Sequence, residues 1–175
     1  MNNILVLAPL PYSVTELSPA MSAETLDYHY ENLARGYVTR FNNNEGNPVF
    51  NKAGAFLHNI FFQQLQPYAE TNQPFGKSLD FINHYYEDFS KFKQEVKNAA
   101  FEIQGSGWVY LSSDGKIRTI KNHVIFHDIV VLIDWWEHSW ALDYHANKGG
   151  YIDNIWNTIN WSIVNEKLPD YHSDN

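Results

Sequence analysis

The spacing of apolar residues predicts two helices in the first part of the chain. Over residues 25–41 apolar and aromatic side chains recur every three or four positions, which is the spacing of one helix face. Ser22 precedes this stretch and is suited to cap its first turn. A turn rich in Asn, Gly and Pro follows at residues 41–48, and a second helical pattern covers residues 52–65. We therefore expect an antiparallel helical hairpin.

The pattern changes in the second part of the chain, where helical spacing gives way to short alternating or continuous apolar runs. The expected helices cover residues 77–87, 90–101 and 151–166, and the expected strands cover residues 107–111, 116–120 and 124–133. Residues 112–115, Ser-Ser-Asp-Gly, are typical of a turn between two antiparallel strands. Helices, then strands, then a helix indicate an α+β fold, with an N-terminal helical hairpin and a C-terminal domain whose three-stranded antiparallel sheet is flanked by helices. We place the domains at residues 1–70 and 71–175.

Composition narrows the chemistry that this fold can carry. The 175 residues include eight His and no Cys, so a metal site would have to use nitrogen and oxygen ligands. The formal net charge of −8 argues against binding to nucleic acid. No apolar run is long enough to cross a bilayer, and the N-terminus does not read as a secretory signal. We expect a cytoplasmic protein without a membrane partner.

The densest group of candidate ligands is the run Asp134-Trp-Trp-Glu-His138, which follows an apolar strand pattern. Carboxylate and imidazole groups suit iron and manganese, although an Asp and a His at this spacing also occur at surfaces and helix caps. His29 and His58 lie in the middle of the two predicted hairpin helices, where facing helices can each present one imidazole. Taken alone, either His is more often a partly buried residue that is satisfied by its neighbours than a metal ligand.

Several motifs, in order along almost the whole chain, resemble the iron/manganese superoxide dismutases. They are Leu10-Pro-Tyr12, Ser22-Ala-Glu-Thr-Leu-Asp-Tyr-His-Tyr30, Phe89-Ser-Lys-Phe-Lys93, Gln104-Gly-Ser-Gly-Trp108, Asp134-Trp-Trp-Glu-His138 and the run from Tyr151 to Trp161. The Gln-Gly-Ser-Gly-Trp and Asp-x-Trp-Glu-His elements are specific to that family when they occur together. The resemblance implies disproportionation of superoxide by one iron or manganese ion per subunit.

Carried over position by position, the resemblance implies a role for individual residues. The metal ligands would be His29, His58, Asp134 and His138. Tyr37 matches a Tyr near the substrate channel, and Trp108 and Trp136 match aromatic residues that wall the metal pocket. Glu137 matches a residue that hydrogen-bonds a ligand His of a second subunit, which implies a homodimer.

The chain departs from the family at the outer-sphere Gln that tunes the metal. The iron-like position for that Gln, four residues before the second His ligand, is Gly54, and the manganese-like position reads Asn122-His123. His123 is therefore the expected replacement, His127 is the alternative, and a solvated loop His is a third possibility. Because an imidazole can change its protonation near neutral pH, we expect activity that depends more strongly on pH between about 6 and 8 than in an enzyme with Gln.

The channel and its charges also differ from the family pattern. Leu33 and Ala141 occupy the positions of a His and a Tyr that pair across the subunit interface. Since the substrate is an anion and the chain is acidic, positive charge near the channel is required, and Lys148 and Arg35 are the candidates. The alternative functions are a catalytically inactive structural scaffold and a non-redox metal site that holds zinc.

Overall fold

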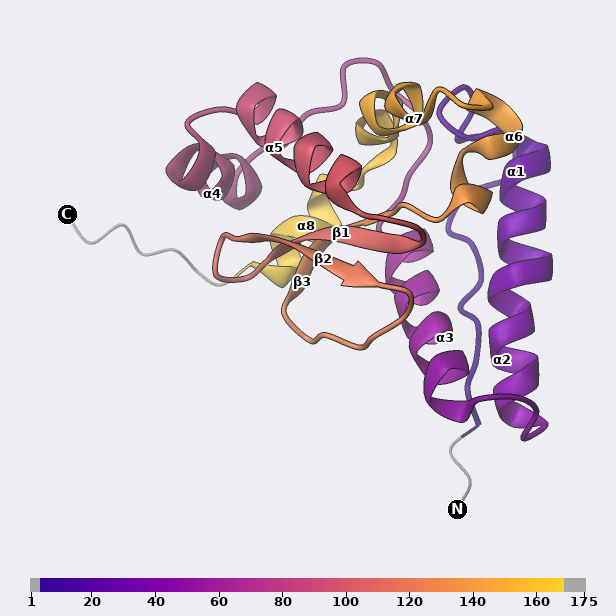
Figure 1. Cartoon of the computed structure of the whole chain (residues 1–175). Coiled ribbons are helices and arrows are strands. Elements are labelled where there is room, and N and C mark those ends of the chain that lie inside the picture. The colour runs from indigo at the N-terminus through magenta and orange to yellow at the C-terminus, as the bar shows by residue number, and fades with distance from the viewer. Residues whose placement is uncertain (1–3, 169–175) are drawn as a thin grey trace.

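The computed structural model describes residues 4–168, and its first feature is a long helical hairpin (Figure 1). The first arm begins with α1 (Ala23–Asp27), continues through η1 (Tyr28–Ala34), which has π-helical hydrogen bonding, and ends with α2 (Arg35–Asn42). Ser22 caps α1 as expected, because its side chain accepts a hydrogen bond from the Thr25 amide. The π segment was not expected, and it contains one of the candidate ligands.

The second arm, α3 (Pro48–Gln63), begins earlier than the sequence pattern indicates. The Asn47 side chain accepts a hydrogen bond from the Phe50 amide at 3.0 Å, and Pro48 occupies the first turn, where its missing N–H costs nothing. The start predicted at residue 52 is therefore four residues late, because the cap lies inside a segment that the composition marks as a turn.

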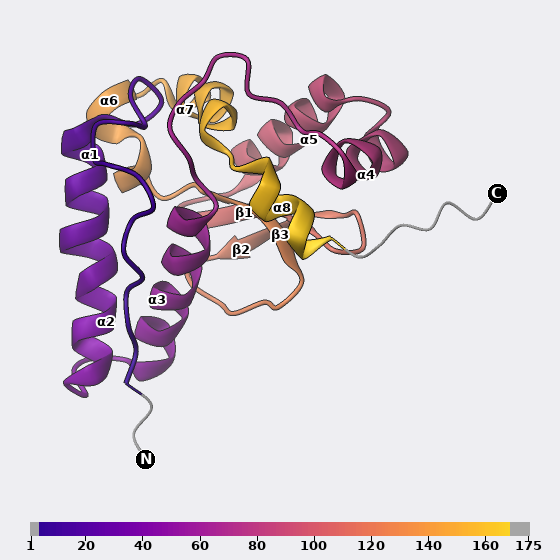
Figure 2. The ribbon, with the colours of Figure 1, turned by 180° about the vertical axis from the view of Figure 1, so that it is seen from behind.

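The chain before the hairpin runs alongside both of its arms (Figure 1, Figure 2). Asn42 of α2 and Asn59 of α3 hold it by bonding backbone groups near its start, at 2.9 Å in each case. The Tyr30 hydroxyl donates to the Ala8 carbonyl at 2.8 Å, and the Tyr12 hydroxyl donates to the Phe62 carbonyl at 3.0 Å. The N-terminal segment thus ties the two arms together.

The sheet consists of β1 (Gly107–Ser112), β2 (Ile117–Lys121) and β3 (Ile129–Asp134) in the order β2-β1-β3, all antiparallel. The third strand is shorter than the predicted 124–133. The Ser113 amide donates to the Asp128 carbonyl at 2.8 Å, so the chain joins β1 only from that point, and the preceding loop exposes Val124 and Phe126. The apolar residues of this loop resemble a strand pattern, so the sequence predicts the start of the strand too early.

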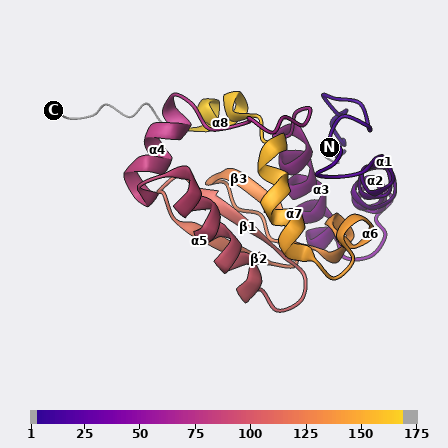
Figure 3. The same ribbon diagram turned by 90° about the horizontal axis from the view of Figure 1, so that it is seen from above.

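Helices pack on both faces of the sheet, as the view from above shows (Figure 3). α4 (Lys77–Tyr86) and α5 (Phe89–Glu102) agree with the predicted helices to within one residue at each end. The predicted last helix is instead three elements, namely α7 (Lys148–Asn154), η3 (Ile155–Thr158) and α8 (Trp161–Lys167). The break occurs at Asn160, whose side chain accepts hydrogen bonds from the Ser162 and Ile163 amides and so caps a new helix. The α+β fold itself is confirmed.

Gln64, at the end of α3, joins the hairpin to the sheet. Its side chain is fully buried, accepts a hydrogen bond from the Leu132 amide at 2.9 Å and donates one to the Leu132 carbonyl. Leu65 also forms a bridge with Ile159. These contacts fix α3 against β3, and the boundary placed near residue 70 stays a prediction. No helix within residues 4–168 is long and apolar enough to span a bilayer.

Candidate metal centre

Four side chains from four separate elements meet in one buried pocket. His29 comes from the π-helical η1, His58 from the middle of α3, Asp134 from the end of β3, and His138 from η2 (Glu137–Ser139). One potential ligand atom of each lies within 4.8 Å of those of the other three. His29, His58 and Asp134 are fully buried, and the His138 side chain is 12 % exposed. The structure thus brings together the four residues that the resemblance indicates.

The three imidazoles converge on one carboxylate oxygen. Oδ2 of Asp134 lies 3.0 Å from Nε2 of His29, 3.2 Å from Nε2 of His138 and 3.7 Å from Nε2 of His58. The second oxygen, Oδ1, accepts a hydrogen bond from the Trp136 amide at 2.8 Å, which holds the carboxylate in this orientation. All three rings therefore present the same nitrogen to the same point.

The arrangement fits a cation better than it fits hydrogen bonds alone. Nδ1 of His58 lies 2.7 Å from the Gly54 carbonyl, so Nδ1 carries the proton and Nε2 presents a lone pair. That lone pair points into the pocket that also holds the Asp134 carboxylate, and the buried Nε2 of His58 has no hydrogen-bond partner within residues 4–168. A buried lone pair beside a buried carboxylate is costly unless a positive charge lies between them. Three imidazoles and one carboxylate suit iron or manganese.

Electrostatics hold these groups in the protonation states that a metal requires. Burial lowers the pKa of His29 to about 4, and burial also places the pKa of His58 well below its usual range. Burial by itself raises the pKa of Asp134, but His138 and His29 outweigh that effect and hold the pKa far below its usual range. Near neutral pH, His29 and His58 are therefore neutral and Asp134 is ionised.

His123 reaches the same pocket from the loop after β2. Its ring centroid lies 5.7 Å from that of His58, and its ring stacks on Trp136 at 4.5 Å. Nε1–H of Trp108 donates to Nδ1 of His123 at 3.1 Å, so Nδ1 is the acceptor and Nε2 carries the proton. That Nε2–H is buried and has no partner within residues 4–168. His127, in contrast, is exposed and rests against Phe56.

The environment of His123 does not favour the pH dependence expected from the sequence. Burial lowers its pKa to about 4, so the ring stays neutral between about pH 6 and 8. The expectation treated His123 as an imidazole with an ordinary pKa, whereas the side chain is enclosed by aromatic rings. Phe50 is among them, with its centroid 4.7 Å from that of His123.

Tyr37 of α2 packs between the pocket and the first turns of α3. Its ring centroid lies 4.9 Å from that of His123 and 5.3 Å from that of His58. Gly54 is what makes room for this ring, because a Cβ at residue 54 would lie 2.8 Å from Cγ of Tyr37. Burial raises the pKa of the Tyr37 hydroxyl to about 12, so it stays protonated and able to donate.

The other predicted pocket residues lie close to the ligands. Trp108 is fully buried, and its ring centroid is 5.0 Å from that of His58. Trp136 also stacks on His138, at 5.6 Å. Glu137 is exposed and lines a surface hollow together with Trp140 and Lys148. Its carboxylate is therefore accessible to another molecule.

The two cations proposed for steering lie in different surroundings. Arg35 forms a two-bond ion pair with Glu31 on the exposed side of the helix, with Nη2 2.9 Å from Oε1. Nζ of Lys148 lies 5.1 Å from the ring centre of Phe101 and 5.4 Å from that of Trp135. A steering role for either residue stays a prediction, and Leu33 and Ala141 are both partly buried.

Sequence reasoning missed two residues that contact Tyr37. The Phe50 ring lies 5.8 Å from the Tyr37 ring, and the Arg40 guanidinium lies 5.0 Å from its centre. Arg40 is one helical turn after Tyr37 on α2, so its position relative to a predicted channel residue was the available signal. Phe50 lies in the first turn of α3, between the predicted turn at residues 41–48 and the predicted helix start at residue 52.

Comparison with known proteins agrees with this geometry. Residues 5–48 match the alpha-hairpin domain of the iron/manganese superoxide dismutases, and residues 74–167 match their C-terminal domain. The chain is 32% identical to an iron superoxide dismutase of Pyrobaculum aerophilum over 93% of this chain and 90% of that protein. It is also 32% identical to one of Bacteroides fragilis, over 91% and 96% of the two chains, and 30% identical to one of Escherichia coli K12, over 93% and 97%.

Proposed function

The chain belongs to the iron/manganese superoxide dismutase family, and on that premise we propose that it converts two superoxide anions and two protons into one O₂ and one H₂O₂. The observation that carries the proposal is the convergence of three imidazole Nε2 atoms on Oδ2 of Asp134 in a buried pocket. In this proposal His29, His58, Asp134 and His138 hold one iron or manganese ion per subunit. When bound, the metal supplies the one-electron oxidation and reduction.

His123 takes the place of the outer-sphere Gln in this proposal. Its Nδ1 is occupied by the Trp108 N–H, which leaves its buried Nε2–H free to donate into the pocket. A permanent hydrogen-bond donor at this position stabilises the same kind of acceptor in the pocket that the amide of a Gln would stabilise. Trp108 thus fixes the tautomer of His123, and Trp136 fixes the plane of its ring by stacking.

Tyr37 provides a second donor beside the pocket. Its hydroxyl remains protonated because burial raises its pKa to about 12. Its ring is held by Gly54 and Phe50, so the position of the hydroxyl depends on the start of α3 as much as on α2. We assign it to orient small molecules that enter the pocket and to pass protons inward.

We further propose a homodimer in the cytoplasm. Glu137 is an exposed carboxylate directly beside the ligand His138, and a second copy could bond its own His138 to it. Apolar Leu33 and Ala141 replace a hydrogen-bonded pair that other family members place between subunits. Removing both partners together avoids leaving a buried polar group unsatisfied. Sedimentation of the metal-loaded protein and of Glu137→Ala tests this assembly, and an unchanged dimer in the variant would contradict the role of Glu137.

The first experiment is to strip the protein of metal, refill it separately with iron and manganese, and measure superoxide disproportionation and metal content. We expect about one ion per chain and activity with at least one of the two metals. Stoichiometric uptake without activity would instead favour the inactive scaffold. Tightly held zinc in the purified inactive protein would favour the zinc site.

The role of His123 is tested by a pair of variants and a matched control. We expect His123→Leu to lower the rate by roughly 10-fold or more, since groups that orient a metal site commonly matter by 10- to 100-fold. His123→Gln keeps a donor and an acceptor and should restore most of that loss. Burial lowers the pKa of His123 to about 4, so this imidazole stays neutral between about pH 6 and 8. The rate of His123→Gln relative to that of the unmodified protein should therefore stay constant over this pH range.

The control for these variants is His127→Leu, which removes an exposed imidazole from the same loop. Its rate should match that of the unmodified protein. If His127→Leu lost activity and His123→Leu did not, the assignment of the outer-sphere group would pass to His127.

A further inference from the structure

An acidic protein that consumes an anion requires positive potential where the anion enters. The chain carries a formal net charge of −8, so its average field repels superoxide. Only cations close to the pocket, and not already neutralised by a carboxylate, can reverse that repulsion locally. The position and pairing of each cation therefore matter more than their number.

Arg40 meets the first condition, because it contacts a residue that itself contacts the pocket. Its guanidinium carbon lies 5.0 Å from the centre of the Tyr37 ring. That ring is 4.9 Å from the ring of His123 and 5.3 Å from that of His58, centre to centre. A single aromatic ring therefore separates the guanidinium from two of the imidazoles at the pocket.

The side chain of Arg40 is held in place from two sides. Its Nε donates to Oδ1 of Asn51 at 3.3 Å, and Asn51 is itself buried and donates to the Glu45 carbonyl at 2.8 Å. Gly36, one turn earlier on the first arm, leaves space for the guanidinium, because a Cβ there would lie 3.0 Å from Nη1 of Arg40. The neutral Asn51 amide fixes the cation without reducing its charge.

Arg40 also meets the second condition. Within residues 4–168 no carboxylate lies within ion-pair distance of its guanidinium, and its two terminal nitrogens form no hydrogen bond. The carboxylate of nearby Glu45 instead accepts a hydrogen bond from Asn43 at 3.3 Å. Arg35, five residues earlier, shows the contrast, because its charge is neutralised by Glu31.

We propose that Arg40 steers the anionic substrate toward the Tyr37 side of the metal pocket. This inference rests on the proposed superoxide dismutase activity. Arg40 touches neither the ligands nor the reacting atoms, so it acts on the rate of encounter and not on the chemical steps. Its terminal N–H groups are available to an anion that approaches the pocket.

The test measures the second-order rate constant with superoxide for metal-loaded protein at low and high ionic strength. We expect Arg40→Gln to lower the low-salt rate about 2- to 5-fold and Arg40→Glu to lower it further, because steering by a local field changes association rates by about 10-fold or more in total. Arg40→Lys keeps the charge and should keep most of the rate. Near 0.5 M salt, where screening acts within roughly 4 Å, the differences should disappear.

Arg118→Gln is the matched control, since it makes the same change in net charge. Arg118 lies on β2 beside Asp114, at the end of the sheet opposite to Trp108 and the pocket. Its low-salt rate should stay close to that of the unmodified protein. Metal content and the thermal midpoint of every variant show whether the pocket is intact.

Three results would overturn the steering role. One is an unchanged low-salt rate in both Arg40→Gln and Arg40→Glu. Another is an equal loss of rate in Arg118→Gln, which would indicate that net charge alone matters. The third is a loss of rate in Arg40→Gln that persists at high salt or is shared by Arg40→Lys, which would indicate an effect of packing against Tyr37. An active unmodified protein with any of these outcomes leaves the proposed function standing. An unmodified protein that is inactive with both metals overturns the function and the steering role together.

Discussion

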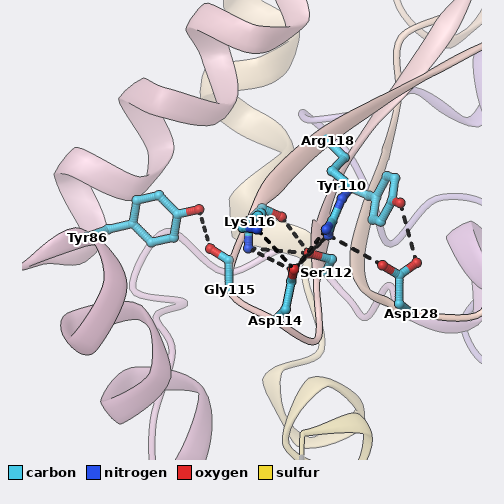
Figure 4. Close-up of polar contacts among 8 residues, drawn as sticks. All are labelled: Tyr86, Tyr110, Ser112, Asp114, Gly115, Lys116, Arg118 and Asp128. Carbon is cyan, nitrogen blue, oxygen red and sulfur yellow. Dashed lines mark hydrogen bonds and ion pairs between the residues drawn. The ribbon is translucent and has the colours of Figure 1, made fainter.

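Two aspartates at opposite ends of the sheet show how the same side chain serves a metal pocket and a surface turn. Asp134, at the end of β3, is fully buried and faces three imidazoles. Asp114, in the turn between β1 and β2, has a side chain that is 47 % exposed and forms two 2.7 Å bonds with the Arg118 guanidinium (Figure 4). Both have a pKa below the usual range, but the compensating charges differ.

At Asp114 the positive charge is part of the protein. Arg118 and the Ser112 hydroxyl hold the pKa of Asp114 low, and the Lys116 amide donates to the same carboxylate at 3.3 Å. At Asp134 the neighbours are imidazoles, and burial keeps both His29 and His58 neutral near pH 7. The comparison teaches that the turn carboxylate is compensated by a guanidinium of the protein itself, whereas the buried carboxylate shares its pocket with imidazole nitrogens that suit an external cation.

The largest expected effect comes from removing the charge of Asp134, and removing the charge of Asp114 is the control. Asp134→Asn should abolish metal retention and lower activity by at least about 100-fold, because losing a group that merely orients a ligand already costs roughly 10- to 100-fold. Asp114→Asn should retain metal and activity. Metal content after gel filtration, followed by the rate with superoxide, checks both variants. Full metal retention by Asp134→Asn would contradict the claim that the pocket is built around a cation.

A smaller effect is expected when the packing of the pocket is changed without touching a ligand. Gly54→Ala places a Cβ 2.8 Å from Cγ of Tyr37, so the Tyr37 ring must move. We expect a loss of about 1–3 kcal/mol in the free energy of unfolding and a rate lower by about 10-fold. This loss would oppose the helix propensity of Ala, which favours the substitution by about 1 kcal/mol.

Gly149→Ala is the control for that helix effect. Gly149 lies in α7, and a Cβ there would meet no atom closer than 3.7 Å. Chemical denaturation of the metal-free proteins should show Gly149→Ala at least as stable as the unmodified protein. Equal stability changes in the two variants would mean that Tyr37 gives way freely and that Gly54 is not required by its ring.

The fold could be predicted from the sequence wherever a local pattern determined the structure. Ser22 before an amphipathic run marked the first helix, and Ser112-Ser-Asp-Gly115 marked the turn between β1 and β2. The turn is stabilised locally, with Gly115 at φ 78° and its amide donating to the Ser112 carbonyl at 3.0 Å. From a helix distant in sequence, the Tyr86 hydroxyl adds a bond to the Gly115 carbonyl at 2.7 Å (Figure 4). Local causes leave a trace in the local sequence, and these elements were placed correctly.

Features that depend on contacts distant in sequence, or on a local hydrogen-bond pattern that residue spacing does not encode, were not predicted. The π-helical η1 is closed by a bond from the Arg35 amide to the Tyr30 carbonyl, and no spacing rule distinguishes this from an ordinary turn. The start of β3 depends on a bond between the backbones of Ser113 and Asp128. The depressed pKa of His123 likewise follows from burial among rings contributed by other elements.

The candidate site was predicted by motif, but its electrostatics were not. The resemblance named His29, His58, Asp134 and His138, which the structure brings within 4.8 Å of one another. It could not show that Arg35 is neutralised by Glu31, because that pairing depends on side-chain conformation. Nor did it draw attention to Arg40, whose importance depends on contacts with Tyr37 and Asn51 that appear only after folding.

The smallest expected effect is on stability at the turn. Asp114 is exposed, so its pairing with Arg118 is screened by solvent, and Asp114→Asn should lower the thermal midpoint at pH 7 by about 2 °C or less. Because the folded-state pKa of Asp114 is lowered, its full contribution is present above the unfolded value of about 3.9 and is lost progressively as the pH falls from there through the lower folded-state value. The difference between the two proteins should therefore vanish on acidification, and high salt at pH 7 should also reduce it. Thermal unfolding of the metal-free proteins across about pH 2–7 checks this, with Asp134 left intact in both. A difference that does not shrink as the pH falls from about 5 to about 2 would show that Asp114 acts through the geometry of the turn and not through its charge.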